Sequence, residues 1–360
     1  MNDGARLALT NLTFEELQAW VVSLGEPAYR AQQIRQWLYQ ELAQSFVEMT
    51  TLPLSLRQRL AEAATISAVQ PQASLTSSDG LTEKVLLALP DGSTIESVLM
   101  LYEGRQTVCV STQVGCPIRC IFCATGRSGY VRNLTAGEIV DQVLYFARQL
   151  KGRGLQVTNV VVMGMGEPFL NYAATWQALT TLHDPKGFAL GARHMTISTA
   201  GIVPGIERMA KEPLQVGLAV SLHAPNDALR NQLVPINRKY PLGTLIPACQ
   251  RYTEEMGRRI TFEYALIDGV NDSPPLAREL ATLLKGMLCH VNLIPCNPGS
   301  GGECRPSSRQ RVLAFQKQLK QAGIPNTLRV GRGIEIQAGC GELRSRAASE
   351  YVAGALDVSV

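Results

Sequence analysis

Three cysteines within eight residues constrain this chain more than any other feature. Cys116, Cys120 and Cys123 are separated by three and then two residues, and their neighbours are mostly small or apolar. A structural zinc site usually takes four ligands from two separated cysteine pairs, and the sequence near this triplet has no second pair. Three thiolates can instead hold three irons of a 4Fe–4S cluster and leave the fourth iron open to a small molecule. Three unrelated core cysteines would rarely lie so close together.

The C-x3-C-x2-C spacing resembles the signature of the radical S-adenosylmethionine (SAM) enzymes. In that superfamily the open iron binds the amino and carboxylate groups of SAM. One electron from the cluster then cleaves SAM to methionine and a 5′-deoxyadenosyl radical. The resemblance implies one 4Fe–4S cluster, with Cys116, Cys120 and Cys123 as its ligands, and a SAM pocket beside it.

The cysteine content also bears on where such a protein works. Nine cysteines in 360 residues, without a basic and apolar leader at the N-terminus, indicate a reducing, cytoplasmic location in which thiols serve metals or catalysis. No apolar run is as long as a membrane span, so we expect no membrane association. The net charge of +4 is too small to indicate nucleic-acid binding by itself.

Residues 1–75 predict a small, all-helical accessory domain. Thr13 and Glu16 have the spacing of a capping box, and Ile34 and Leu38 recur at helical spacing. Four arginines are expected on the outer surface of this domain: Arg30, Arg35, Arg57 and Arg59. Such a domain could dock on RNA or could simply pack against the rest of the chain, and the sequence favours neither.

The rest of the chain predicts an α/β fold. Residues 76–106 should form a β-hairpin extension, because two apolar-rich runs flank the turn Pro90-Asp91-Gly92. Glu96 lies in the second run, where a lone carboxylate usually faces solvent. Over residues 107–345, apolar strands alternate with helices up to a last strand near residues 327–336. This order predicts a buried parallel sheet in a partial (β/α)6-type barrel, followed by a tail over residues 346–360.

Polar residues and glycines follow the predicted barrel strands at their carboxyl ends, where barrels of this kind place their chemistry. At Gly166 a ligand can approach the backbone, and the Glu167 carboxylate can bind an ammonium group. The other strand ends carry Ser198, Ser221, Leu222, His223 and Asn297. Helix capping explains the serines and the asparagine, but it explains Glu167 and His223 less well. Together with the cysteine triplet, these residues predict a SAM pocket, and the glycine-rich loop at residues 297–302 should lie near it.

Two further cysteines are candidate catalytic thiols. Cys340 lies between glycines after the last strand, a placement typical of an exposed, mobile segment. Cys109 lies on the strand that leads into the cysteine triplet. Residue types alone favour Cys340 as a nucleophile over Cys109, whereas Cys249, Cys289 and Cys304 are expected to be core residues.

Several motifs together resemble the RlmN/Cfr family of radical-SAM methyltransferases, which methylate a ring carbon of adenine in RNA. They cover most of the chain: YRAQQIRQWLY, CVSTQVGCPIRCIFCATG, RNLT, GMGEP, SLHAPN, LIPCNP and AGCGEL. Among family members, the sequence is most similar to the housekeeping type that methylates C2. The residues that would contact SAM are Gly166, Glu167, Ser198, Ser221, Leu222, His223 and Asn297. The resemblance further implies that Cys340 carries the methyl group, that Cys109 is its thiol partner and that Glu96 accepts a proton.

The family's chemistry follows from the inertness of the adenine C2–H group, which is neither acidic nor nucleophilic. Ordinary polar methyl transfer from SAM therefore cannot methylate this carbon. The resemblance implies that one SAM methylates Cys340 and that a radical from a second SAM removes a hydrogen atom from this methyl group. The resulting carbon radical adds to adenine C2, and Glu96 takes the C2 proton. Cys109 then attacks Cys340, which releases methyladenosine and leaves a disulfide.

The same resemblance implies the partners of the enzyme. The substrates would be an adenosine of 23S rRNA near the peptidyl transferase centre and the adenosine immediately 3′ of the anticodon in some tRNAs. A flavodoxin-like or ferredoxin-like protein would donate electrons, and nothing in the sequence requires more than a monomer.

Three alternatives stay open at this point. The antibiotic-resistance branch of the family methylates C8 and shares every catalytic residue. A radical-SAM enzyme of another class, such as a sulfur-inserting enzyme or an activase, would not need Cys340. An iron–sulfur electron carrier or an RNA-binding scaffold would not need an open iron.

Overall fold

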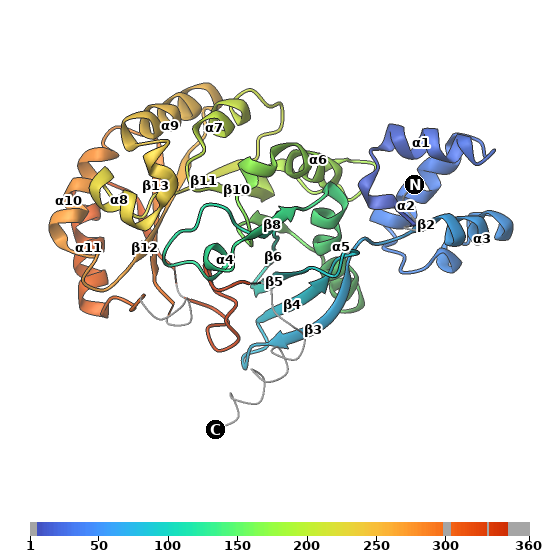
Figure 1. The fold of residues 1–360 in the computed structure, drawn as a ribbon, viewed down its shortest axis with the longest axis horizontal. Coiled ribbons are helices and arrows are strands. Elements are labelled where there is room, and N and C mark those ends of the chain that lie inside the picture. Colours follow the sequence, from blue (N-terminus) through green and yellow to red (C-terminus); the bar gives the residue numbers. More distant parts are fainter. Residues whose placement is uncertain (1–5, 298–303, 330, 345–360) are drawn as a thin grey trace.

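The chain forms a small helical domain beside a larger α/β domain (Figure 1). The computed structural model describes residues 6–297, 304–329 and 331–344. The glycine-rich loop at residues 297–302 and the tail at 346–360 therefore lie almost entirely outside the described residues. Within the described part of the chain, no helix is both long enough and apolar enough to cross a membrane.

The N-terminal domain contains three helices and a two-stranded parallel ladder. Its elements are β1 (Leu7–Ala8), a 3-10 helix (Leu9–Asn11), α1 (Phe14–Ser23), α2 (Tyr29–Tyr39), a 3-10 helix (Phe46–Glu48), α3 (Leu54–Ala63) and β2 (Ala64–Thr65). The predicted capping box is confirmed, because the Thr13 side chain accepts a hydrogen bond from the Glu16 N–H and the Glu16 carboxylate accepts one from the Thr13 N–H. Ile34 and Leu38 are fully buried, so they share the inner face of α2.

The outward placement predicted for the arginines is wrong for Arg35. Its side chain is buried and forms an ion pair with Asp184 of the barrel domain (2.6 Å). Its guanidinium also lies over the Phe14 ring, 3.9 Å from the centroid. Arg35 therefore joins the two domains, whereas Arg59 is exposed and Arg30 and Arg57 are half-buried.

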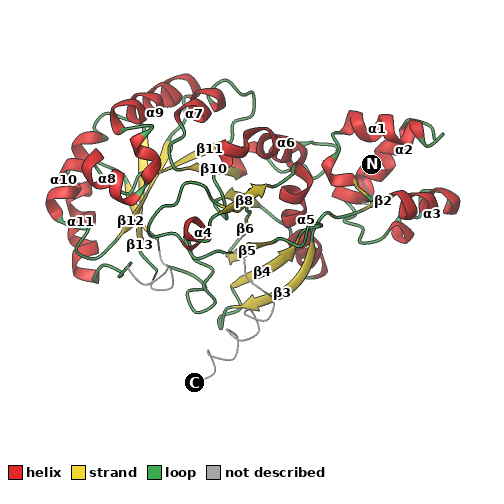
Figure 2. Cartoon of the chain, in the orientation of Figure 1, coloured by secondary structure: helices red, strands yellow, loops and turns green. Residues whose placement is uncertain are grey.

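One sheet of ten strands runs through the α/β domain, and Figure 2 shows helices arranged around its outer face. The strand order is β14-β13-β12-β11-β10-β9-β6-β5-β4-β3. All neighbours from β6 to β14 are parallel, which confirms the predicted α/β fold with a partial barrel. The parallel strands are β6 (Arg105–Cys109), β9 (Asn159–Val162), β10 (Met195–Thr199), β11 (Gly217–Ser221), β12 (Ile260–Leu266), β13 (Cys289–Pro295) and β14 (Asn326–Leu328).

Three antiparallel strands extend the sheet at the β6 edge. The predicted hairpin is β4 (Thr82–Ala88) and β5 (Thr94–Tyr102), and β5 pairs with β6. A further strand, β3 (Gln70–Thr76), pairs with β4 and was not predicted, because its exposed polar residues carry little strand signal. The last strand, β14, is three residues long, shorter than the predicted run over residues 327–336.

Helices connect the parallel strands and pack their apolar faces against the sheet. They are α5 (Ala136–Gly152), α6 (Tyr172–His183), α7 (Val203–Met209), α8 (Asp227–Leu233), α9 (Leu242–Met256), α10 (Pro274–Leu283) and α11 (Arg309–Gln321). Asp141 on α5 connects the barrel to the N-terminal domain, because its carboxylate accepts hydrogen bonds from the Thr10 hydroxyl (2.9 Å) and the Ala68 N–H (2.6 Å). Burial raises the pKa of Asp141 to about 6.

Candidate active site

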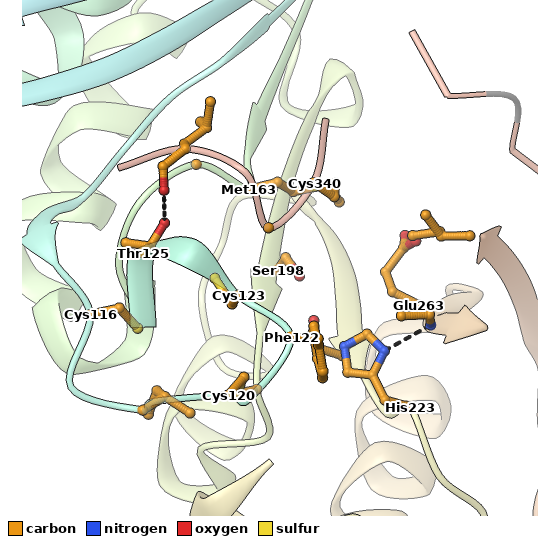
Figure 3. A pocket seen from close by; sticks show the side chains of 18 of the residues that line it. Cys116, Cys120, Phe122, Cys123, Thr125, Met163, Ser198, His223, Glu263 and Cys340 are labelled. Carbon is orange, nitrogen blue, oxygen red and sulfur yellow. Dashed lines mark hydrogen bonds between the residues drawn. The ribbon is translucent and has the colours of Figure 1, made fainter. Parts of the chain in front are cut away.

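A pocket at the centre of the molecule lies at the carboxyl ends of the parallel strands. Figure 3 shows Cys116, Cys120 and Cys123 on the loop at one side of it and His223 and Glu263 at the other. The predicted site residues that line it are Cys116, Cys120, Cys123, Gly166, Glu167, Ser198, Ser221, His223, Asn297 and Cys340. Six segments that are distant in sequence therefore meet at this pocket.

The cysteine loop is held by a short hairpin and a turn of helix. β7 (Gln113–Gly115) pairs with β8 (Tyr130–Asn133), and α4 (Ala124–Arg127) follows Cys123. Gly115 has a φ of 76°, and a Cβ at this position would overlap the carbonyl of Gly129. The same carbonyl accepts the Cys116 N–H (2.8 Å). The close approach of the backbone at residue 115 to the backbone at residue 129 therefore requires glycine at position 115. It fixes where Cys116 enters the pocket.

The chemistry of the cysteine loop fits an iron–sulfur cluster. Burial raises the pKa of Cys116 to about 12, and burial together with Cys123 and Cys116 raises that of Cys120 well above its usual value. Thiolates in such a place form when a metal displaces the protons. Among the described residues, no three Cys, His, Asp or Glu side chains are close enough together to hold a single ion.

Glu167 reaches the pocket from a segment whose backbone packs closely against residues 112–113. Gly166 has a φ of 104°, and a Cβ here would overlap Gln113 and Thr112. The Glu167 carboxylate accepts hydrogen bonds from the N–H groups of Phe169 (3.1 Å) and Ala200 (2.7 Å). Burial raises the pKa of Glu167 to about 7, against the lowering effect of these hydrogen bonds. A buried carboxylate of this kind suits a ligand that brings a cation.

His223 is buried at the end of β11 in a left-handed conformation (φ 61°) that is unusual for a residue with a side chain. Its Nδ1 accepts the Ala265 N–H (2.9 Å), and its carbonyl accepts a hydrogen bond from the Asn271 side chain (2.8 Å). Burial, with Arg230 as a lesser cause, lowers the pKa of His223 to about 3. The imidazole is therefore neutral, with its proton on Nε2, and its ring meets Phe122 edge to face (4.6 Å between centroids).

Arg230 was missed by the sequence analysis, although it holds two strand ends together. Its side chain is fully buried. It donates to four oxygens: the carbonyls of Ala200 (2.6 Å), Ser221 (3.1 Å) and Leu222 (3.1 Å) and Oδ1 of Asn237 (2.7 Å). The predicted site residue Leu222 does not line the pocket with its side chain, which is fully buried. Its backbone is fixed by this arginine instead.

Glu263 was also missed, because the strand-end argument did not examine positions inside a strand. It lies within the apolar strand β12, is buried and lines the pocket. Asn292 donates to its carboxylate (3.0 Å), and the Arg329 guanidinium lies 3.9 Å away. A charged residue within an otherwise apolar barrel strand was the available signal.

The segment that carries Cys340 closes over the cysteine loop. The Ala124 N–H donates to the Gly341 carbonyl (2.7 Å), and the Thr125 hydroxyl donates to the Leu343 carbonyl. The Asn297 side chain donates to the Cys340 carbonyl (3.5 Å). Residues 337–344 are called the carrier segment below. By accessible surface Cys340 is exposed, as the sequence predicted. The surrounding protein nevertheless raises the pKa of its thiol, and Arg329 opposes this effect.

A second pocket adjoins the first and shares Cys340 with it. Cys109 and Cys340 both line this pocket, together with Val98, Tyr102, Arg329 and Arg332. Cys109 is paired with Val98 across β5 and β6. Burial raises the pKa of Cys109 to about 12. The two candidate catalytic thiols therefore face one cavity, and both are free cysteines.

Glu96 lies behind this second pocket and lines neither cavity. The usual expectation for a lone strand carboxylate, that it faces solvent, is wrong here, because the side chain is fully buried. It forms an ion pair with Lys84 (3.2 Å), and its other oxygen accepts the Arg344 N–H (2.9 Å). The sequence analysis singled out neither Lys84 nor Arg344.

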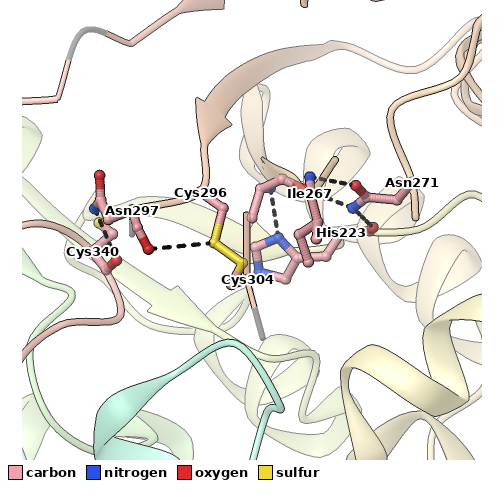
Figure 4. Close-up of a disulfide and its surroundings, with 8 residues drawn as sticks. His223, Ile267, Asn271, Cys296, Asn297, Cys304 and Cys340 are labelled. Atoms are coloured by element: carbon pink, nitrogen blue, oxygen red, sulfur yellow. Dashed lines mark hydrogen bonds between the residues drawn. A yellow bond between two sulfur atoms is a disulfide. The ribbon is translucent and has the colours of Figure 1, made fainter. Parts of the chain in front are cut away.

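The disulfide in the structure joins Cys296 and Cys304, beside the wall of the main pocket (Figure 4). Cys304 is buried in the core, as expected, and its disulfide was not predicted. This disulfide is also not the pair that the family resemblance implied, Cys109 and Cys340. Figure 4 places Asn297 and Cys340 on one side of this disulfide and His223 and Asn271 on the other.

Comparison with known proteins adds to this geometry. A family model described as "Ribosomal RNA large subunit methyltransferase N-terminal domain" matches residues 7–66, and one described as "Radical SAM superfamily" matches residues 110–280. A protein of Chloroflexus aurantiacus, named "Probable dual-specificity RNA methyltransferase RlmN", is 50% identical over 351 residues, or 94% of this chain and 91% of that protein.

Two further similarities cover almost the whole chain. The "Ribosomal RNA large subunit methyltransferase N" of Nitrosopumilus maritimus is 48% identical over 345 residues, which are 94% of this chain and 98% of that protein. The crystal structure of a radical SAM methyltransferase from Sphaerobacter thermophilus matches with a TM-score of 0.92 and 53% identity. That match covers 94% of this chain and 99% of the other.

Proposed function

The chain belongs to the RlmN family of radical-SAM RNA methyltransferases, and we propose from its site that it methylates C2 of adenosine by way of Cys340. One observation carries the proposal. Cys340 lines the pocket of the three cluster cysteines and also the pocket that contains Cys109. A methyl carrier must meet both SAM and the thiol that later releases it, and Cys340 is placed for both.

In the proposed reaction, Cys116, Cys120 and Cys123 hold a 4Fe–4S cluster. With an open iron, this group supplies the electron that cleaves SAM and so provides the radical that removes a hydrogen atom from a methyl group. The family membership and the meeting of the three cysteines at one pocket support this assignment. A flavodoxin-like or ferredoxin-like protein would deliver the electron.

The remaining pocket residues would bind and orient SAM. Glu167 would accept a hydrogen bond from the SAM ammonium group, because that cation relieves the cost of a buried carboxylate. Asn297, Ser198 and Ser221 offer polar contacts from three other strands. His223 is neutral and can donate only through Nε2, since its Nδ1 already accepts the Ala265 N–H. Leu222 would contribute through its backbone.

Cys340 would take a methyl group from one SAM, and a second SAM would provide the radical. After the carbon radical has added to C2, the adduct would lose one electron to the oxidised cluster and its C2 proton to Glu96. The Cys109 thiolate would then attack the Cys340 sulfur and form a disulfide. The carbon–sulfur bond would break toward carbon, which would take up a proton to become the methyl group, and an external reductant would later reduce the disulfide. Because burial raises the pKa of Cys109, this attack needs help in removing its proton, and Arg329 is the nearby cation that lowers the pKa.

The proposed substrates are the adenosine of 23S rRNA near the peptidyl transferase centre and the adenosine 3′ of the anticodon in tRNA. The names of the relatives as dual-specificity RNA methyltransferases support both. The N-terminal domain is the proposed RNA-binding accessory, with Arg59 exposed on its surface. We propose a monomer.

A product analysis tests the proposal. Anaerobically reconstituted protein is incubated with SAM, a reductant and either a 23S rRNA fragment or tRNA, and the nucleosides are identified by mass spectrometry. We expect 2-methyladenosine, which Cys340→Ala abolishes while Cys249→Ala leaves it unchanged. 8-Methyladenosine would instead assign the chain to the C8 branch. Turnover by Cys340→Ala would exclude a methyl-carrying Cys340.

A further inference from the structure

A fully buried ion pair lies on the hairpin extension, behind the pocket that contains Cys109 and Cys340. Lys84 on β4 and Glu96 on β5 have no solvent-accessible surface, and Nζ of Lys84 lies 3.2 Å from Oε1 of Glu96. Lys84 is among the largest side chains that are fully buried. Burial of an ammonium group costs several kcal/mol unless it is paired and hydrogen-bonded, so this lysine calls for an explanation.

The register of the hairpin places both charges on the same face of the sheet. Glu96 is opposite Leu86, and Lys84 is opposite Val98, so the two charged residues are diagonal neighbours. Val98 lines the second pocket and is paired with Cys109 on the next strand. The ion pair therefore belongs to the face of the sheet that supports the proposed methyl-transfer chemistry.

Both members of the pair also hold the carrier segment, one at each end. Nζ of Lys84 donates to the Gln337 carbonyl (3.1 Å), and Oε2 of Glu96 accepts the Arg344 N–H (2.9 Å). Cys340 lies between these two points. Gln337 has a left-handed backbone (φ 51°) that side-chain-bearing residues rarely adopt, so this end of the segment benefits from a fixed partner.

Stability alone gives no reason for this arrangement. Well-packed apolar side chains of similar size usually replace a buried ion pair at no cost to stability. A buried carboxylate that must accept a proton from a substrate, however, has to be held in one orientation, and an ion pair with a buried cation provides this. Among the described residues, Lys84 forms an ion pair with Glu96.

We propose that Lys84 is a positioning residue that fixes the orientation of the Glu96 carboxylate and joins it to the segment that carries Cys340. The inference rests on the proposed function, in which Glu96 accepts the C2 proton. The Arg344 N–H donates to the other carboxylate oxygen, so Glu96 itself also contacts the carrier segment. Lys84 holds Glu96 and the Gln337 end in place, so that the Glu96 carboxylate and the Cys340 sulfur keep a fixed position relative to each other.

The test separates methyl loading from proton removal. Lys84→Met removes the cation at similar length, and Lys84→Arg keeps it. Lys151→Met is the matched control, because Lys151 pairs with Glu41 on the surface (3.5 Å). Three quantities are measured by mass spectrometry: methylation of Cys340 by SAM without RNA, 5′-deoxyadenosine formed, and methyladenosine formed. The ratio of the last two reports how many radical events reach product.

We expect Lys84→Met to methylate Cys340 and to form 5′-deoxyadenosine, while methyladenosine per 5′-deoxyadenosine falls about 10- to 100-fold, as for an impaired general base. Lys84→Arg should restore most of this ratio, and Lys151→Met should match the wild type. A wild-type ratio in Lys84→Met, or an Lys84→Arg variant as impaired as Lys84→Met, would overturn the proposal.

A second measurement tests whether Lys84 holds the carrier segment, and it does not depend on methyladenosine formation. It therefore remains informative if the proposed function fails. It is the rate at which iodoacetamide alkylates Cys340 in the folded protein. Loss of the Lys84 hydrogen bond should raise this rate about threefold to tenfold. If Lys84→Met does not fold, Lys84→Met/Glu96→Gln, which removes both charges of the ion pair, is measured instead and is compared with Glu96→Gln alone. An unchanged rate in the folded variant would show that Lys84 does not hold the segment.

Discussion

Arg230 should be a main support of the strand ends that form the pocket, and Arg230→Met tests this directly. The variant removes a fully buried guanidinium that donates to four oxygens, including the carbonyls of Ala200 and Ser221. A buried acceptor left without a donor costs about 1–3 kcal/mol. Burial lowers the pKa of Arg230 to about 10, so removal of the cation returns about 3 kcal/mol. The four acceptors together cost about 4–12 kcal/mol, so the net expectation is a loss of about 1–9 kcal/mol in the free energy of unfolding.

The assay is urea denaturation of the apoprotein followed by circular dichroism, with SAM binding measured in parallel. Arg278→Met is the control, because Arg278 is exposed on α10 and makes one surface hydrogen bond with Gln318 (3.3 Å). SAM affinity should fall as well, because the Ala200 backbone also donates to Glu167. A variant within about 1 kcal/mol of the wild type would refute the reasoning, since ordinary surface substitutions have effects of that size.

Three further predictions concern the domain contact, the thiol partner and the carrier segment. Because burial raises the pKa of Asp141 to about 6 from 3.8, the folded state binds the proton more tightly and stability falls by about 3 kcal/mol as the pH rises from about 4 to above 6. Asp141→Asn should remove this slope in urea titrations at several pH values, and an unchanged slope would contradict the assignment. Cys109→Ala should stop after carbon–carbon bond formation and accumulate an RNase-sensitive protein–RNA adduct on denaturing gels, which Cys249→Ala should not do. Gly339→Ala should slow the methylation of Cys340 in intact-protein mass spectra, because an added Cβ would overlap Asn297 and Glu342; an unimpaired rate would mean that this packing is not needed.

Local patterns in the sequence predicted the fold well, because they depend on residues that are close together in the chain. The Thr13 capping box, the turn at Pro90-Asp91-Gly92 and the alternation of apolar strands with helices all act over short distances. The strand ends were then placed together by a general property of parallel barrels. This is why Glu167 and His223 could be expected in one pocket without a structure.

The interactions that support the site were not predictable in the same way, because each depends on a partner far along the chain. Arg35 is buried by Asp184, which lies 149 residues away. The Glu96 carboxylate meets the Arg344 N–H across 248 residues. An arginine in an exposed-looking helix and a glutamate in a strand carry no local sign of such contacts. The roles of Glu96 and Cys109 entered through the family resemblance, and the structure adds the contacts through which Lys84 and Arg230 would act.

The passage of the methyl group through Cys340 is the central claim, and isotope labelling tests it most directly. Cys340 is first methylated with unlabelled SAM, and the protein is freed of nucleotides. RNA, a reductant and SAM with a trideuterated methyl group are then added for a single turnover. The account predicts that the first methyladenosine formed carries no deuterium from SAM and that only later turnovers incorporate it. Deuterium in the product of the first turnover would show direct transfer from SAM and would contradict the account.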